Sequence, residues 1–163
     1  TVCVNMGSPE LVPKNIPIDS NLDRFISEDV EVDGKVYKVT GVSMGNPHAV
    51  TFIDDTDSLE IEKIGPKFET HKLFPKKINT EFAQIVDRNT VKMRVWERGA
   101  GETLACGTGA CATMVAANLN GLVDDEADLV LLGGTLHIKW DKNENKVYMT
   151  GPAKFVFDGT ITL

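Results

Sequence analysis

The chain has 163 residues, of which 42% are hydrophobic and 25% charged, so its composition supports a packed core and disfavours disorder. Its formal net charge of −7 disfavours a nucleic-acid partner, because the phosphate backbone would be repelled. No apolar run approaches the roughly 20 residues that span a bilayer, and no secretory signal is visible near the start, so we expect no membrane association.

The first 97 residues consist mainly of short strand patterns separated by turns. The dipeptide Asp33-Gly34 predicts a hairpin. Its two faces would consist of Val30, Val32, Tyr37 and Val39, and of Glu31, Val36 and Lys38. The stretch GVSMGNPHAVTFIDD predicts a strand, a Gly-Asn-Pro turn and a second strand over 49–53. Residues 58–70 favour helix, which Gly65-Pro66 would break, with Pro66 opening a second short helix.

The strand pattern continues after this helical stretch. Residues 78–87 and 91–97 alternate between apolar and polar side chains, and the polar DRNT between them predicts a hairpin loop. Val91, Met93 and Val95 would share one face. Five more short strands are predicted over residues 129–132, 135–140, 146–150, 154–157 and 160–163. Many short strands and few helices indicate an α+β fold with a mostly antiparallel sheet.

One helical segment, over residues 108–120, carries no charged residue. A surface helix would have a polar stripe, so we expect this one to be enclosed on nearly all sides. Gly121 is suited to end it, because the position after a helix often takes the left-handed conformation. We therefore expect a curved, barrel-like sheet wrapped around a buried central helix.

Cys106 directly precedes this helix, in the stretch ERGAGETLACGTGACATMVAANLNG. Unpaired N–H groups and the positive end of the helix dipole would favour a thiolate there, and the same amides can bind a carboxylate or phosphate. Gly107 and Gly109 would allow the backbone to approach such a ligand closely. The alternative is that Cys106 is a small, inert core residue, as many free cysteines are. The residue pattern alone leaves both interpretations open.

Other chemistries find no support in the sequence. Gly99-Ala100-Gly101 lacks the third glycine of a dinucleotide-binding fingerprint. Cys106 and Cys111 lack the paired spacing of a zinc site, and the histidines are scattered, so no metal or cofactor is predicted. Three cysteines are an odd and sparse set, which favours reduced thiols in a cytoplasmic protein over a disulfide framework.

The motif ERGAGETLACGTGACA closely resembles the second cysteine motif of diaminopimelate epimerases, which act in lysine and peptidoglycan-precursor biosynthesis. VNMGSP, GNPHAV, LFPKKINTEFAQ and VYMTGPAKFVFDG resemble further parts of that family, in its order, so the resemblance covers essentially the whole chain. It implies an isomerase that interconverts LL- and meso-diaminopimelate without pyridoxal phosphate or any other cofactor. One thiolate removes the α-proton, and a second thiol returns a proton from the opposite face.

The resemblance also implies roles for individual residues. Cys106 matches the second catalytic cysteine, and His48 and Glu97 match groups that tune the proton affinity of the cysteines. The implied substrate contacts are Asn46, Asn79, Glu97, Arg98, Gly107 and Thr108. Each has a plainer interpretation, such as a turn asparagine, a surface ion pair or a structural histidine.

The sequence departs from the family pattern at one main point, the first of the two cysteines. The family's first cysteine lies in a preceding half of the enzyme, and neither Cys3 nor Cys111 matches it. We therefore expect residues 1–163 to be a single C-terminal epimerase domain without its N-terminal half, with residues 154–163 as a candidate extension into that half. Such a chain would be inactive alone and would expose apolar surface meant for the missing half. The whole enzyme would be a candidate homodimer.

Two other functions stay open from the sequence. A proline racemase or hydroxyproline epimerase has a similar Cys-Gly-Thr-Gly motif, although Glu97-Arg98, GAGET and GNPH favour the diaminopimelate enzyme. A non-catalytic module could instead bind small anions at the helix start and at Arg98 without turnover.

Overall fold

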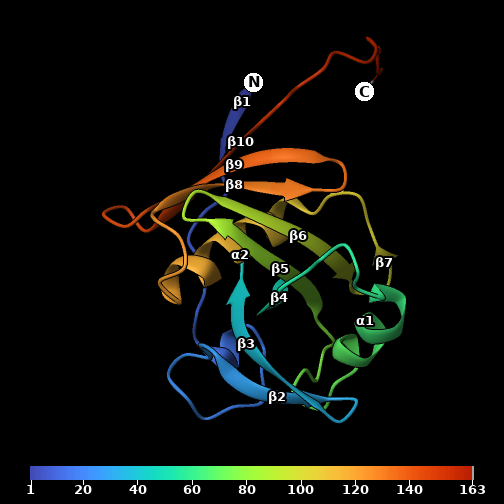
Figure 1. The fold of residues 1–163 in the computed structure, drawn as a ribbon. Helices are drawn as coiled ribbons and strands as arrows, with labels where there is room; N and C mark the ends of the chain where they lie inside the picture. Colours follow the sequence, from blue (N-terminus) through green and yellow to red (C-terminus); the bar gives the residue numbers. More distant parts are fainter. Residues whose placement is uncertain (163) are drawn as a thin grey trace.

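The computed structural model describes residues 1–162, and within them it forms an α+β fold of ten strands and two α-helices (Figure 1). The helices are α1 (Ile61–Glu69) and α2 (Gly107–Leu119), with a short 3-10 turn, η1 (Pro13–Asn15). The strands are β1 (Val2–Asn5), β2 (Glu28–Val32), β3 (Lys35–Ser43), β4 (Pro47–Phe52), β5 (Asn79–Asp87), β6 (Thr90–Glu97), β7 (Gly101–Glu102), β8 (Glu126–Leu131), β9 (Gly134–Asp141) and β10 (Lys146–Gly151). Neither helix of the described chain is long and apolar enough to cross a membrane.

All strands belong to one sheet in the order β1-β10-β9-β8-β6-β5-β4-β3-β2, with β7 paired to β6. The pairs β4–β5 and β6–β8 are parallel, and the other pairs are antiparallel, so the prediction of a mostly antiparallel sheet is confirmed. The connection between β4 and β5 contains α1, and the connection between β6 and β8 contains β7 and α2, because a parallel pair requires a long crossover. The barrel-like closure was a wrong expectation: β1 and β2 end the sheet without pairing with each other, so the sheet stays open.

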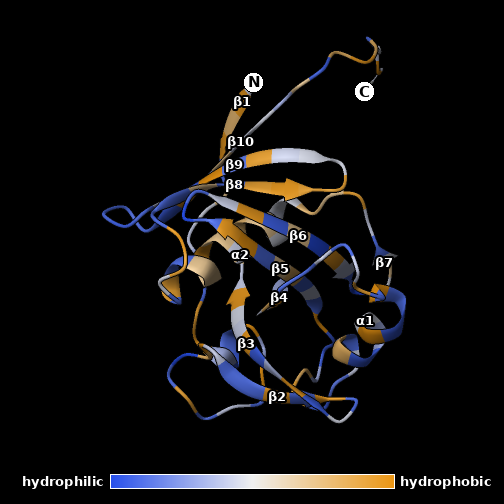
Figure 2. Ribbon diagram, viewed as in Figure 1, coloured by the Kyte–Doolittle hydropathy of each residue, from blue (hydrophilic) through white to orange (hydrophobic). Residues whose placement is uncertain are grey.

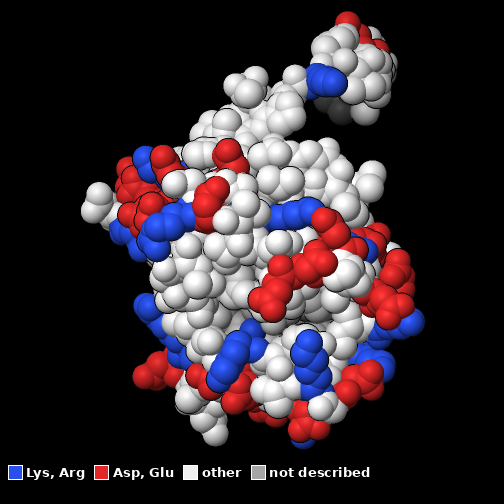
Figure 3. Space-filling view, in the orientation of Figure 1, with Lys and Arg blue, Asp and Glu red and all other residues white. Residues whose placement is uncertain are grey.

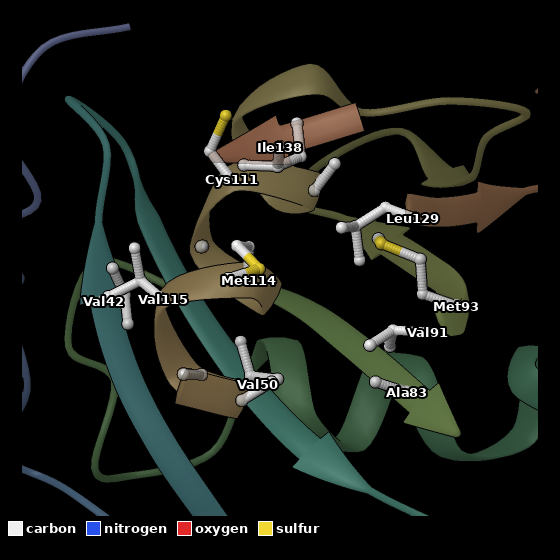
Figure 4. Close-up of a cluster of buried hydrophobic side chains, with 14 of the residues drawn as sticks. Val42, Val50, Ala83, Val91, Met93, Cys111, Met114, Val115, Leu129 and Ile138 are labelled. Carbon is white, nitrogen blue, oxygen red and sulfur yellow. The ribbon is translucent and has the colours of Figure 1, made fainter. Parts of the chain in front are cut away.

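The enclosed position of α2 is confirmed. The sheet curves around this helix, which contacts β3, β4 and β5 on one side and β8, β9 and β10 on the other (Figure 1). Residues 109–117 of α2 are all buried. Figure 4 shows Met114 of α2 in the core that Val50, Met93 and Leu129 of the surrounding strands complete. The uncharged segment is therefore helical because every side of it is covered by apolar strand residues.

Both ends of α2 follow the sequence signals. Cys106 is the N-cap, with extended backbone angles of φ −135° and ψ 103°. At the other end Gly121 has φ +70°, and its N–H donates to the carbonyl of Asn118. The N–H of Leu122 donates to the carbonyl of Ala117, which completes a Schellman motif. The helix therefore begins at Gly107, one residue earlier than the expected start at residue 108 and directly after the cysteine.

The predicted hairpin at Asp33-Gly34 is also confirmed. Both residues have positive φ, 56° and 75°, as a two-residue hairpin turn of the primed type requires. In the paired strands β2 and β3, Val30, Val32 and Val39 are buried and Val36 is exposed. The hairpin covers a second core cluster, on the opposite side of the sheet from α2, to which α1 contributes Ile61 and Phe68. In Figure 2, α1 carries hydrophobic and hydrophilic residues, as expected of a helix with one exposed side.

The expected break of the first helix at Gly65-Pro66 is wrong, because α1 runs without interruption from Ile61 to Glu69. Pro66 removes only one backbone N–H from the helix. Gly65 serves packing instead: a Cβ at this position would lie 2.4 Å from Cδ2 of Trp96. The glycine therefore lets α1 approach the Trp96 indole on β6, which the sequence pattern of a helix breaker does not reveal.

The strands predicted over 154–157 and 160–163 are not present in the described chain. Residues 152–162 have no regular structure and extend away from the body (Figure 1), and Leu163 lies outside the described residues. The side chains of Phe155, Val156, Phe157 and Ile161 are each at least 79% exposed. No neighbouring strand of residues 1–162 offers them hydrogen bonds, so the alternating pattern does not produce a strand. The extension is mostly uncharged in Figure 3, whereas charges of both signs are interspersed over the body.

Candidate active site

Cys106 lies where the sequence predicts, at the N-terminus of α2. The residue is only 8% exposed. Its Sγ accepts a hydrogen bond from the N–H of Gly109 at 3.3 Å and lies 3.5 Å from Oγ1 of Thr108. The amides of Gly107 and Thr108 open the helix, where backbone N–H groups have no intrahelical acceptor. The thiol and unpaired amides are therefore side by side.

The protonation state of Cys106 differs from the expectation. Burial is the largest influence and raises the pKa of the Cys106 thiol, and the carboxylates of Glu81 and Glu97 raise it further. Hydrogen bonds from Thr108 and from the N–H of Gly109 act in the opposite direction but do not compensate. The expected preference for a thiolate is therefore wrong for this chain: the helix start stabilises negative charge, but removal from water costs more. The direction of the shift favours the protonated thiol.

Alkylation of Cys106 by iodoacetamide at pH 7 is accordingly expected to be slower than alkylation of a model thiol, because only the thiolate reacts. The sign follows from the raised pKa: the rate should keep rising above pH 8.5, the ordinary cysteine value, instead of levelling off. The measurement is the pH profile of labelling by mass spectrometry in a Cys3→Ser background, since Cys3 is exposed. Cys111 serves as an internal control, because burial raises its pKa to about 12. A profile that levels off below pH 8.5 would contradict the prediction.

The Glu97-Arg98 pair forms the end of β6 and the start of the following turn. The Glu97 carboxylate accepts a hydrogen bond from the hydroxyl of Thr103, three residues before Cys106. The guanidinium of Arg98 donates to the carbonyl of Lys76 at 3.0 Å and has further donors. Thr103 was missed as a candidate, although it belongs to the GAGET stretch, because the motif was assigned through its charged residues.

Asn79 connects this turn to the Gly-Asn-Pro turn before β4. Its Oδ1 accepts from the backbone N–H of Arg98 at 2.8 Å, and its Nδ2 donates to the carbonyl of Pro47 at 2.9 Å. The side chain is buried. The structural interpretation of Asn79 is therefore confirmed, while its predicted substrate contact stays a prediction.

Glu69 on α1 steadies the same turn from the other side of the sheet. Its carboxylate accepts from Nε1 of Trp96 at 2.8 Å and from the backbone N–H of Gly99 at 3.0 Å. Burial alone would raise the pKa of the Glu69 carboxyl, but these hydrogen bonds and the Lys77 ammonium, 3.5 Å away, together hold it below its ordinary value. The turn that presents Glu97 and Arg98 is thus anchored at both Asn79 and Glu69.

His48 and Asn46 are linked, and a third residue joins them. Nε2 of His48 lies 3.0 Å from Oδ1 of Asn46, and Nδ1 of His48 lies 2.6 Å from Oε1 of Glu81 on β5. Sequence reasoning missed Glu81. A signal existed in the sequence. Glu81 lies two residues before Ala83 and therefore on the same face of a predicted strand, a face where a carboxylate is unusual if it is buried.

Gly107 is the last of the predicted substrate contacts, and Cys3 and Cys111 are the other two cysteines of the chain. Gly107 is close to β10, since a Cβ there would lie 3.1 Å from Sδ of Met149. Cys3 is exposed on the edge strand β1, and Cys111 is buried inside α2, so neither lies at the helix start.

Among residues 1–162 no cluster of three or more His, Cys, Asp or Glu side chains could hold a metal ion.

Comparison with known proteins assigns the family. The family model described as "Diaminopimelate epimerase" matches residues 40–156, which include His48, Glu97 and Cys106. The chain belongs to the diaminopimelate epimerase family. The resemblance inferred from the cysteine motif is therefore confirmed.

Relatives described as diaminopimelate epimerase align over nearly all of this chain. The protein from Acetivibrio thermocellus is 60% identical over 99% of this chain and 58% of its own length. The protein from Methanococcus maripaludis is 52% identical over the same shares, and that from Nostoc punctiforme is 53% identical over 98% of this chain and 58% of its own length. The chain thus spans 58% of the length of these relatives of the diaminopimelate epimerase family.

A solved structure supports the fold. A predicted epimerase from Pseudomonas aeruginosa superimposes with a TM-score of 0.54 at 13% identity, over 90% of this chain and 53% of that chain. At this identity the likeness concerns the fold alone: the diaminopimelate epimerase family member described here shares its α+β architecture.

Proposed function

We propose that this protein supplies the second catalytic cysteine of a diaminopimelate epimerase, which interconverts LL- and meso-diaminopimelate. The observation that carries the proposal is the position of Cys106 as N-cap of α2, within a chain of that family. The thiol is held by the N–H of Gly109 and the side chain of Thr108, next to amides that have no intrahelical acceptor. This arrangement places a proton-exchanging group beside an anion-binding group.

The proposed step is a proton exchange on two faces of the α-carbon. A thiolate on one face removes the α-proton, so the Cα–H bond breaks and an S–H bond forms. A thiol on the other face gives its proton to the α-carbon, and its S–H bond breaks. The pair ends with thiol and thiolate exchanged and the configuration inverted. The raised pKa of the Cys106 thiol in this chain supports assigning it the proton donor's part in one direction of the reaction.

The substrate carboxylate is assigned to the helix start. Backbone N–H groups of Gly107 and Thr108 and the positive end of the α2 dipole would stabilise negative charge on the carboxylate as the α-proton leaves. Arg98 is assigned to a carboxylate as well, because a guanidinium binds carboxylates with two parallel hydrogen bonds. Glu97, held by Thr103, would receive an ammonium group of the substrate.

We also propose that residues 1–163 do not turn over substrate alone. The two-base step needs a second cysteine, whereas Cys3 is exposed on the edge strand β1 and Cys111 is buried within α2. The relatives contain further sequence, because this chain spans 58% of the length of the protein from Acetivibrio thermocellus. The exposed apolar side chains of residues 155–161 would then pack against that further part. A homodimer of the whole enzyme, acting in the cytoplasm, completes this proposal.

The test compares two proteins in D₂O: this chain, and a complete enzyme in which the first part of the Acetivibrio thermocellus relative precedes this sequence. We expect the complete enzyme to interconvert LL- and meso-diaminopimelate with α-deuterium incorporation, and this chain to show neither. Proline and hydroxyproline serve as alternative substrates, and turnover of these alone would favour a proline racemase-like enzyme. Saturable binding of diaminopimelate by the complete enzyme without deuterium exchange would favour an anion-binding module. Enzyme-like exchange by this chain alone would contradict its proposed inactivity.

A further inference from the structure

The backbone of Arg98 is held on both sides of its Cα atom. Its own N–H donates to Oδ1 of Asn79 at 2.8 Å, and the next N–H along the chain, that of Gly99, donates to Oε1 of Glu69 at 3.0 Å. These two N–H groups belong to the two peptide planes that flank the Cα atom. Because the orientations of both planes determine φ and ψ between them, Asn79 and Glu69 together set the direction of the Arg98 side chain.

The guanidinium of the same side chain has a contact of its own. Nη1 of Arg98 donates to the carbonyl of Lys76 at 3.0 Å, in the segment between α1 and β5. That carbonyl shares a peptide group with the N–H of Lys77, which donates to the carbonyl of Phe74 at 2.9 Å. Lys77 has a positive φ of 59°, which few residues other than glycine adopt, so the Lys76 carbonyl belongs to a defined turn. A guanidinium has five N–H donors and can bind a carboxylate while it keeps this contact.

Glu69 is a buried carboxylate whose partners lie on three segments around Arg98. It ends α1, which packs against β6 and β7 (Figure 1), and it is only 8% exposed. Besides the turn after Arg98, it binds Nε1 of Trp96 at 2.8 Å and lies 3.5 Å from the ammonium of Lys77. The Lys77 contact is the weakest of the three, because this side chain is 56% exposed. A buried carboxylate is costly unless donors surround it, and here every donor comes from a segment that holds Arg98.

We propose that Glu69 is a positioning residue: by holding the N–H of Gly99 it keeps Arg98 in the direction in which its guanidinium receives a substrate carboxylate. An arginine side chain has several rotatable bonds, and ordering them on binding lowers affinity. A side chain that is already directed loses less of this freedom when the ligand binds. Glu69 therefore acts on substrate affinity and not on proton transfer at Cys106. This inference rests on the proposed function for the identity of the ligand.

Hydrogen exchange of this chain, followed by NMR, tests the anchor without any substrate. We expect the Gly99 amide to be protected although Gly99 is exposed, because its N–H is bonded to Glu69. Glu69→Met keeps the length of the side chain and removes both acceptor oxygens, so this amide should exchange roughly 10-fold faster. Glu62→Met is the matched control, because it changes an exposed glutamate on the first turn of α1 in the same way. A Gly99 amide that exchanges in the unmodified chain as fast as in an unstructured peptide would overturn the inference.

The consequence for binding is measured in the complete enzyme by a double-mutant cycle. Arg98→Ala should raise KM for diaminopimelate roughly 10- to 100-fold, the range expected for losing hydrogen bonds between charged groups. Glu69→Met should raise KM by a smaller factor, and kcat should change less than KM in both variants. The double variant should match Arg98→Ala within about twofold, because Glu69 acts through Arg98. A general loss of structure would instead add its effect to that of Arg98→Ala.

The outcomes of this cycle separate the positioning role from the proposed function. An unchanged KM in Glu69→Met, or an effect of Glu69→Met that persists in full after Arg98→Ala, would refute the positioning role. Glu62→Met should leave KM unchanged. An unmodified complete enzyme without turnover would count against the proposed function, and protection of the Gly99 amide decides in either case whether Glu69 holds the turn.

Discussion

Replacing Cys106 by alanine is expected to lower epimerisation by the complete enzyme by roughly 10²- to 10⁴-fold, the usual contribution of one positioned acid or base. The thiol is held at the start of α2 by Gly109 and Thr108, and neither Cys3 nor Cys111 occupies that position. The measurement is the rate of interconversion of LL- and meso-diaminopimelate, together with α-deuterium incorporation from D₂O.

The matched control for this variant is Cys3→Ala. Cys3 is exposed on β1, remote in sequence from the helix start, and should be replaceable without loss of turnover. A Cys106→Ala enzyme that keeps a rate within a few-fold of the unmodified enzyme would contradict the proposed role. Circular dichroism of both variants separates this result from a loss of folding.

The second large effect concerns the stability of the helix that carries Cys106. Met114→Ala is expected to lower the free energy of unfolding by about 2–5 kcal/mol, because truncation of a buried methionine leaves a cavity that the surroundings fill only partly. Met114 is 0% exposed and lies in the core between α2 and the strands (Figure 4). The measurement is urea unfolding followed by circular dichroism.

Met114→Leu is the matched control, because it conserves volume and should cost less than about 1.5 kcal/mol. Leu132→Ala provides an exposed comparison, since that side chain is 56% exposed. A Met114→Ala variant as stable as Leu132→Ala would show that α2 is not enclosed by the sheet as described.

The sequence was most informative where local pattern and tertiary packing agree. The segment that begins at Cys106 has no charge and ends at Gly121, and these two features predict an enclosed helix with defined ends. The Asp33-Gly34 turn is equally local, because a two-residue hairpin turn of the primed type requires positive φ at both residues, and both have it. Such features depend on residues close in sequence, so they can be predicted from the chain alone.

Predictions of local structure from the sequence failed where a residue's role depends on a contact far away along the chain. Gly65 looks like a helix breaker, but it makes room for Trp96, 31 positions further along the chain. The pattern of residues 154–157 favours a strand, yet a strand forms only where another strand offers hydrogen bonds. The open sheet has the same origin: pairing of its end strands depends on long-range geometry that no local pattern records.

At the candidate site, some features were predicted from the local sequence and others depend on long-range packing. The motif placed Cys106 correctly at the helix start, and it pointed to the turn that Asn79 and Arg98 share. It could not reveal that burial outweighs the helix start and raises the pKa of the Cys106 thiol, because burial is a property of the folded chain. Glu81 was overlooked for the same reason: its partner, His48, is 33 positions away.

Protection of Cys106 from alkylation by diaminopimelate tests the central claim most directly. The complete enzyme is treated with iodoacetamide at pH 9, with and without saturating substrate, and labelling at each cysteine is quantified by mass spectrometry. If Cys106 faces the bound α-carbon beside the amides of Gly107 and Thr108, substrate should suppress its labelling and leave that of the exposed Cys3 unchanged. Equal labelling of Cys106 with and without saturating substrate would contradict this.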